Sequence, residues 1–177
     1  VKQTPRDAKR LKDLGDTTQA LGNVWFTKKD YSKARQAYKD AVEIRRRLVA
    51  ANASDGEYQR VLANTYMNLG RADFDAAQVS TDDKEYLELL GEAQKQYSEA
   101  QKIREEALTK AKLSKDLQSK LRRDLAKGYF QLGNLKKILP KPTDPIGPMT
   151  QALAAFEQIA ADEPDDLETK KIGRAHV

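Results

Sequence analysis

One short pattern occurs twice in this chain, and its recurrence limits the folds that the chain can adopt. The residues from Tyr58 to Gly70 read YQRVLANTYMNLG, and those from Leu121 to Gly133 read LRRDLAKGYFQLG. Both contain Leu-Ala-x-x-Tyr-x-x-Leu-Gly, with an Arg two residues before the first Leu. The apolar residues recur at spacings of three and four, which place them on one face of an α-helix. The recurrence predicts a helical unit that the chain uses more than once.

The rest of the chain has the same helical period. Apolar residues at helical spacing run through six segments, and no run of alternating Val, Ile and Thr indicates a strand. We therefore predict an all-α fold of six main helices in three antiparallel pairs. The predicted helices begin near Asp7, Tyr31, Glu57, Asp83, Ser114 and Pro148.

Short polar segments separate the predicted helices. Gly56 is the strongest stop signal before the third helix. The segment STDD at 80–83 and Ser114 offer N-cap side chains for the fourth and fifth helices. The segment PKPTDPIGP at 140–148 is too rich in proline to be helical, and its last residue, Pro148, is expected to begin the sixth helix.

Small and aromatic residues align the three pairs with one another. The first helix of each pair ends in Leu-Gly or an equivalent glycine, and the second carries the pattern Ala-x-x-x-Tyr/Phe. A small residue lets two helices approach closely, and a large aromatic residue fills the space beside it. The predicted packing residues are Leu21, Gly22, Trp25, Ala34, Tyr38, Ala41, Tyr66, Leu69, Gly70, Ala93, Tyr97, Ala100, Tyr129, Leu132, Gly133, Ala152 and Phe156.

These spacings resemble those of the tetratricopeptide repeat, and Pro164 stands where that repeat usually places its terminating proline. The resemblance implies antiparallel helix pairs stacked as a right-handed superhelix. It covers a single array over 1–171, with three units at about 7–54, 57–113 and 115–163. Gly70 lies 48 residues after Gly22, which exceeds the usual period of about 34. The extra residues predict either protruding loops or longer helices.

The long second helices, AVEIRRRL at 41–48 and AQKIREEAL at 100–108, are similar to those in tetratricopeptide arrays of large bacterial proteins. In that group the array often follows a serine/threonine protein kinase domain. Because the chain opens on Val1 and not Met, we expect a fragment of a longer protein. The resemblance implies that this protein is bacterial, and the lack of Cys fits a cytoplasmic location. The last residues, IGRAHV at 172–177, look like the translated end of a sequencing adapter and are expected to be a non-native tail.

The sequence does not favour an enzyme. It has no Cys, and its single His, His176, lies in the adapter-like tail, so the usual nucleophile–base pairs are missing. The acidic segments at 81–85 and 162–166 lack the alternating ligands and turn glycine of a calcium loop. We expect no catalytic residue, metal site or cofactor. Nucleic acid is an unlikely partner because aromatics do not interleave with the basic residues, and no apolar run approaches the roughly 20 residues of a membrane span.

Charge separates along the second half of the chain. Lys and Arg dominate 110–141, whereas 144–168 contains only acidic charges. Either two solvated helix faces attract one another, or the basic face takes an acidic partner.

The predicted recognition surface is a concave groove lined by the first helix of each pair. The exposed polar residues expected there are Gln19, Asn23, Asn64, Asn68, Lys127 and Gln131. Some tetratricopeptide domains hold a peptide's terminal carboxylate with a clamp of two Lys, two Asn and one Arg. Resemblance to that clamp extends to Asn23, Asn68 and Lys127, while Gln19 and Gln131 replace expected cations. We therefore predict a protein-binding scaffold with a polar groove for a peptide or extended segment.

Two alternatives remain open at this point. The chain could be a regulatory domain attached to a serine/threonine kinase, or a spacer or self-association module that forms a homo-oligomer. In either case it would have no ligand groove of its own.

Overall fold

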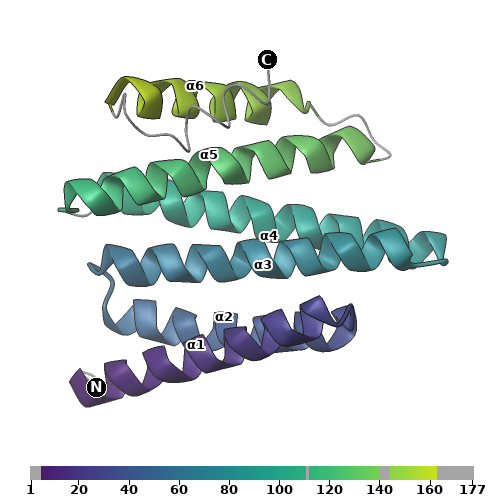
Figure 1. Ribbon diagram of the computed structural model, residues 1–177, viewed down its shortest axis with the longest axis horizontal. Coiled ribbons are helices and arrows are strands. Elements are labelled where there is room, and N and C mark those ends of the chain that lie inside the picture. The colour runs from purple at the N-terminus through teal and green to yellow at the C-terminus, as the bar shows by residue number, and fades with distance from the viewer. Residues whose placement is uncertain (1–4, 111, 140–143, 163–177) are drawn as a thin grey trace. The chain divides into compact units, whose positions relative to one another are not determined.

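The computed structural model describes residues 5–110, 112–139 and 144–162, which contain six α-helices and no strand (Figure 1). The all-α prediction and the number of main helices are thereby confirmed for these residues. The chain divides into two compact units, 1–111 and 112–177. The helices are α1 (Pro5–Thr27), α2 (Tyr31–Ala51), α3 (Gly56–Val79) and α4 (Asp83–Lys110) in the first unit, and α5 (Lys115–Ile138) and α6 (Ile146–Asp162) in the second.

In the first unit each helix packs against its neighbour in sequence. Contacts join α1 to α2, α2 to α3, and α3 to α4 (Figure 1). Short turns connect the helices, so neighbours run antiparallel. The central cluster of buried residues draws on α2, α3 and α4 and includes Tyr38, Tyr66 and Ala100. Trp25 and Phe26 of α1 pack against this cluster while remaining partly exposed.

Side-chain caps set where α2 ends and α3 begins. The Asn52 amide donates to the Leu48 carbonyl at 3.0 Å and closes the last turn of α2. The Asp55 carboxylate then accepts from the backbone amides of Glu57 and Tyr58, each at 3.0 Å. Gly56, predicted as a stop, is instead the first residue of α3. The predicted break between the two helices is observed at 52–55, and α3 begins one residue before the predicted start near Glu57 because Asp55 caps it there.

The extra length of the second helix pair is absorbed by helix. α3 continues to Val79 and α4 starts at Asp83, so only a three-residue turn joins them. Asp82 caps α4 by accepting from the Glu85 amide at 2.7 Å. Ser114 caps α5 as predicted, accepting from the Leu117 amide at 3.2 Å. Of the two expected outcomes, longer helices and not a protruding loop are observed for this pair.

Two glycine–tyrosine contacts set the spacing of the pairs in the first unit. A Cβ added to Gly22 would come within 2.6 Å of the Tyr38 ring. A Cβ added to Gly70 would come within 2.7 Å of the Tyr97 ring. Both distances are too short for any real side chain, so each glycine lets a buried tyrosine lie directly on the backbone of the facing helix.

The second unit uses a different pairing from the predicted one. Gly133 faces Met149, whose Cγ would lie 2.7 Å from an added Cβ, and not Phe156. Phe156 instead packs with Ala126 and Ala152. The small partner of Phe156 is thus Ala126, seven residues before Gly133, and the partner of Gly133 is Met149, seven residues before Phe156. Each shift corresponds to about two helical turns. The alignment was wrong because an Ala can serve as the small partner as well as a Gly.

The start of α6 also differs from the prediction. α6 begins at Ile146, and Pro148 lies inside its first turn. The Asp144 carboxylate accepts from the backbone amides of Ile146 and Gly147, at 2.9 and 3.2 Å. Proline is tolerated there because the first-turn amides have no partner within the helix. Pro164 and the tail at 172–177 lie outside the described residues.

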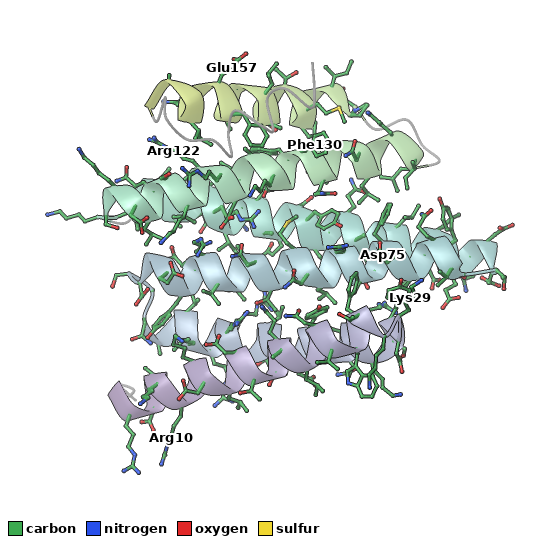
Figure 2. All side chains as sticks on the ribbon, viewed as in Figure 1. Arg10, Lys29, Asp75, Arg122, Phe130 and Glu157 are labelled. Atoms are coloured by element: carbon green, nitrogen blue, oxygen red, sulfur yellow. The ribbon has the colours of Figure 1, made fainter. Side chains whose placement is uncertain are left out.

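Most of the predicted packing residues are buried, and Trp25 and Tyr129 are partly buried. Leu21 differs, because its side chain is 50% exposed. Half of this side chain stays open to solvent although α1 packs along α2. Figure 2 shows Arg10, on the same helix, extending away from the rest of the first unit. Leu21 is therefore not part of the core of this unit.

We expect Gly70→Ala to lower the free energy of unfolding by about 1–3 kcal/mol, because the added methyl must displace the Tyr97 ring. Gly91→Ala is the matched control, since nothing lies within 4 Å of a Cβ at that position. That substitution should raise stability by up to about 1 kcal/mol through helix propensity. Urea denaturation followed by circular dichroism measures both. Equal effects of the two substitutions would contradict the close approach at Gly70.

Candidate functional site

A small polar pocket lies between α1 and α3, with α2 beneath it. Its volume is about 140 Å³. It is lined by Asn23, Phe26 and Thr27 of α1, Tyr38 of α2, and Asn68 and Arg71 of α3. We call it the Asn23–Asn68 pocket. It brings together two of the residues predicted for the groove.

Tyr38 fixes the orientation of Asn23. The buried Tyr38 hydroxyl donates to Asn23 Oδ1 at 2.8 Å. Burial raises the pKa of Tyr38, so the hydroxyl keeps its proton and remains a donor at neutral pH. Because the Asn23 oxygen is taken, its NH₂ group is the part left to meet a ligand. The tyrosine that packs on Gly22 thus also orients the Asn23 amide in the pocket.

Arg71 adds a cation that the sequence analysis missed. Its guanidinium lies 4.9 Å from the centroid of the Phe26 ring, a stacking contact that holds it over the pocket. Its ion pair with Asp75 is long, at 3.9 Å, and the Arg71 side chain is 68% exposed. Arg71 directly follows Gly70, as Asn23 follows Gly22. This equivalent position in the two repeats was the sequence signal that could have identified Arg71 as a pocket residue.

Asn68 completes the pocket. No hydrogen bond of its side chain occurs within the part of the chain that the structure describes. With Asn23 and Arg71 it supplies N–H donors, which suit the oxygen acceptors of a peptide carbonyl or a carboxylate.

Gln19, predicted for the groove, is held inside a network around Arg45. Arg45 is 4% exposed and donates to the Gln19 side-chain oxygen and to the Thr65 hydroxyl. It also donates to Asp16 at 2.7 Å. This network joins α1, α2 and α3. The side-chain oxygen of Gln19 is therefore occupied by the protein's own arginine, and Gln19 does not line the Asn23–Asn68 pocket.

Asn64, also predicted for the groove, is held in the same way in the second helix pair. Its side-chain oxygen accepts from Arg104 of α4 at 2.8 Å. Arg104 is 3% exposed and also donates to Gln101 at 2.8 Å. Arg45 and Arg104 both follow an Ile in the repeated second-helix pattern. This pattern marks a buried arginine that reaches the first helix of its pair, a role that the sequence analysis did not assign.

Lys127 and Gln131 belong to α5 in the second unit, and both are exposed. They lie one turn apart on that helix. The Asn23–Asn68 pocket is lined entirely by residues of the first unit. Among the described residues, no group of three or more His, Asp or Glu could hold a metal ion. Over the same ranges, no helix has the length and apolar character that a membrane span requires.

We expect Asp16→Asn to cost about 1–3 kcal/mol of stability at neutral pH, since Arg45 loses a charged partner. Partial burial raises the pKa of Asp16, but hydrogen bonds from Lys12 and Arg45 outweigh it and leave the pKa below its ordinary value. The carboxylate therefore stabilises the fold above the ordinary pKa of Asp, about 3.9. This stabilisation is lost as the pH falls through the lowered pKa.

Urea denaturation at a series of pH values measures this effect. The difference between wild type and Asp16→Asn should shrink as the pH falls below about 4. Lys12→Met is the control, because its pair with Asp16 is exposed to solvent and should contribute far less to stability. A penalty for Asp16→Asn that is the same at neutral and acid pH would rule out the ion pair as its source.

The sequence matches no model of a known protein family. It also matches no curated protein. The resemblance to tetratricopeptide repeats therefore rests on the residues of this chain, above all on the glycine–tyrosine pairs and the repeated Leu-Ala-x-x-Tyr-x-x-Leu-Gly pattern.

Proposed function

We propose that the chain is a protein-binding module of the tetratricopeptide type. In this proposal the first unit holds an extended segment of a partner protein across the Asn23–Asn68 pocket. The main support for this proposal is that Asn23, Asn68 and Arg71 line the same pocket. The other residues that line it are Phe26, Thr27 and Tyr38. The repeated pattern supports the module type, because it supplies shape without any recurring reactive group.

The chemistry of the pocket suits recognition of oxygen acceptors. A volume of about 140 Å³ admits one polar group or small side chain, and not a drug-sized ligand, whose pockets are usually about 300–1,000 Å³. The rest of a bound segment would lie along α1 and α3. Two amide donors fix a backbone or carboxylate oxygen by geometry, and the arginine strengthens the bond through its charge.

The same resemblance provides a biological context for the proposal. Long-period arrays of this kind belong to larger bacterial proteins, where they often accompany a serine/threonine protein kinase domain. We therefore propose that the module belongs to the cytoplasmic part of such a protein and that its three units stack as a right-handed superhelix. Sequencing the reading frame on both sides of this segment tests the proposal directly.

We expect Asn68→Ala combined with Arg71→Ala to weaken peptide binding by about tenfold or more, because a charged hydrogen bond contributes about 1.5–3 kcal/mol. The probe is a displayed library of random peptides with free C-termini, selected on the wild-type chain. Affinities of the enriched peptides are then measured by fluorescence anisotropy. Neither residue is buried, so helicity and melting temperature should not change.

Lys127→Ala combined with Gln131→Ala is the matched control in α5, and it should leave these affinities unchanged. The proposal fails if no peptide is enriched, or if the enriched peptides bind the Asn68/Arg71 variant as tightly as wild type. A loss only in the α5 variant would move the recognition site to the second unit.

We propose self-association as a second candidate function on the basis of one separate observation. Leu14, Leu21 and Val24 of α1 are 52%, 50% and 50% exposed. Their spacings of seven and three place them on one helix face, as in the seam between two helices of a coiled coil. A charged residue in this seam would oppose pairing of two copies.

We expect wild type to sediment as a dimer at high micromolar concentration and Leu21→Glu to sediment as a monomer. Analytical ultracentrifugation of both chains measures this difference. Leu153→Glu is the control, since Leu153 of α6 is 56% exposed and lies outside the α1 face. A wild-type chain that stays monomeric at every concentration would exclude this candidate.

A further inference from the structure

A second groove lies between α2 and α4, which both pack against α3. Three cavities of about 510, 410 and 300 Å³ line up along it. The first two share Arg35, Glu85 and Leu89, so they form one continuous depression. We call the whole depression the α2–α4 groove. It uses none of the residues that line the Asn23–Asn68 pocket.

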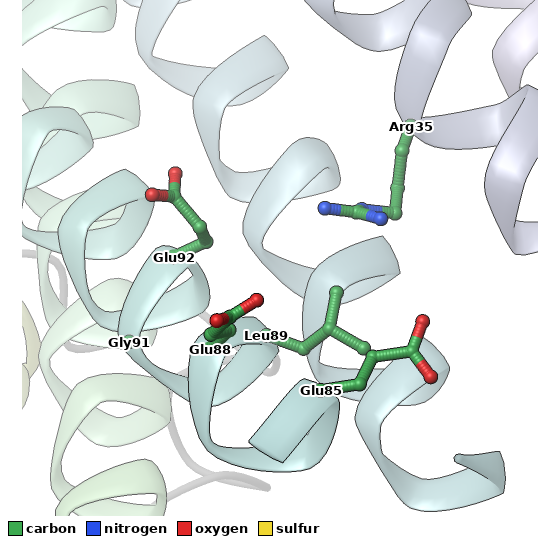
Figure 3. Close-up of a pocket in the computed structure, with 6 residues that line it drawn as sticks. All are labelled: Arg35, Glu85, Glu88, Leu89, Gly91 and Glu92. Atoms are coloured by element: carbon green, nitrogen blue, oxygen red, sulfur yellow. The ribbon is translucent and has the colours of Figure 1, made fainter. Parts of the chain in front are cut away.

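The middle of this groove is acidic. Figure 3 shows Arg35 on α2 facing Glu85, Glu88 and Glu92 across the cavity of about 410 Å³. The three glutamates recur at spacings of three and four, so they share one face of α4. Leu89 lies between them and provides an apolar wall for the stem of an incoming side chain.

Arg35 offsets only part of the charge of these three carboxylates, because it is a single cation that also pairs with a buried carboxylate. Its Nε donates to the carboxylate of Asp73, whose side chain is 1% exposed. The nearest lysines to the glutamates are weak partners. Lys84 lies 3.7 Å from Glu88, and Lys95 lies 3.9 Å from Glu92, both at exposed positions. The cavity therefore keeps an excess of negative charge that suits a cationic side chain.

The next cavity along the groove has the opposite charge. Lys39 and Arg46 of α2 and Lys95 of α4 line it, against the single carboxylate of Glu99. Its floor is apolar, with Tyr66 and Leu69 of α3 both buried. Arg46 lies 6.0 Å from the centroid of the Tyr66 ring. An anionic side chain would be attracted here.

The distance between the two cavities follows from the helix that forms their wall. Glu88 of the acidic cavity and Lys95 of the basic cavity are seven residues apart on α4, which corresponds to about 10 Å along the axis. Two residues separated by seven on a partner helix span the same length. A groove between two helices, with a third as its floor, also has the shape that an incoming helix fills.

We propose that the α2–α4 groove binds a helix of a partner protein. This helix places a Lys or Arg in the acidic cavity and an Asp or Glu, seven residues away, in the basic cavity. Its apolar side meets Leu89 and the floor formed by Tyr66 and Leu69. The groove is a second interaction surface, and it does not depend on peptide binding in the Asn23–Asn68 pocket.

The test uses a displayed library of helical peptides of fixed length with randomised surface positions, selected on the wild-type chain. Enriched peptides should carry a basic and an acidic residue seven positions apart. Binding of a representative peptide should weaken about tenfold or more in the triple variant Glu85→Gln, Glu88→Gln and Glu92→Gln. It should also weaken in Lys39→Gln with Arg46→Gln, and with rising salt concentration.

A second triple variant controls for net charge alone. Asp13→Asn, Glu57→Gln and Glu157→Gln remove the same charge from exposed positions outside the groove, and binding should be unchanged. Asn68→Ala with Arg71→Ala should also leave it unchanged, which separates this surface from the other pocket. Circular dichroism confirms that each variant is folded.

Any of three results would overturn the proposal. The first is that no helical peptide is enriched. The second is that the two triple variants weaken binding equally, which would reduce the effect to net charge. The third is that the enriched peptides depend only on Asn68 and Arg71.

Discussion

The close approach of helices at Gly22 and Gly70 is the constraint on which the first unit depends. At each place a tyrosine ring lies against the backbone of the facing helix, leaving no room for a Cβ. A buried aromatic ring contributes a large apolar area, but only at a site shaped to receive it. The contact at Gly22 also sets the Tyr38 hydroxyl under Asn23. One packing feature therefore fixes both the spacing of the helices and the orientation of the Asn23 amide in the Asn23–Asn68 pocket.

Buried arginines help to set the register of the packed helices. Arg45 reaches Asp16, and Arg104 reaches Asn64, in each case from the second helix of a pair to the first. A buried charge stabilises a fold little, or even destabilises it, compared with an apolar residue of the same size. It does penalise any slip of one helix along another, because the guanidinium would then lose its partners. The tyrosines thus set how close the helices lie, and the arginines help to set their register.

Helical period, together with the glycine and tyrosine positions, was enough to predict six helices and most of the buried residues. The same pattern could not predict which side-chain amides bond within the protein and which remain exposed. The sequence predicts Gln19, Asn23 and Asn64 as exposed polar residues. In the structure buried arginines donate to the side-chain oxygens of Gln19 and Asn64. Those arginines come from the second helix of each pair, so the sequence around each amide does not reveal the bond; the signal lies in the repeated Ile-Arg of the second helices. The predicted pairing of Gly133 with Phe156 was wrong for a similar reason, because the sequence offers both Gly133 and Ala126 as the small partner of Phe156.

The two grooves of the first unit differ in the range of the forces that they offer. The Asn23–Asn68 pocket is narrow and presents hydrogen-bond donors, which act only at contact and distinguish ligands by geometry. The α2–α4 groove is wider and carries opposite charges along its length, and these act over about 8–10 Å before salt screens them. Charges of that kind speed association and orient a partner, whereas desolvated hydrogen bonds slow its release. The donors of the pocket and the charged residues of the groove take no part in the glycine–tyrosine contacts, so substitutions among them can change either surface without disturbing those contacts.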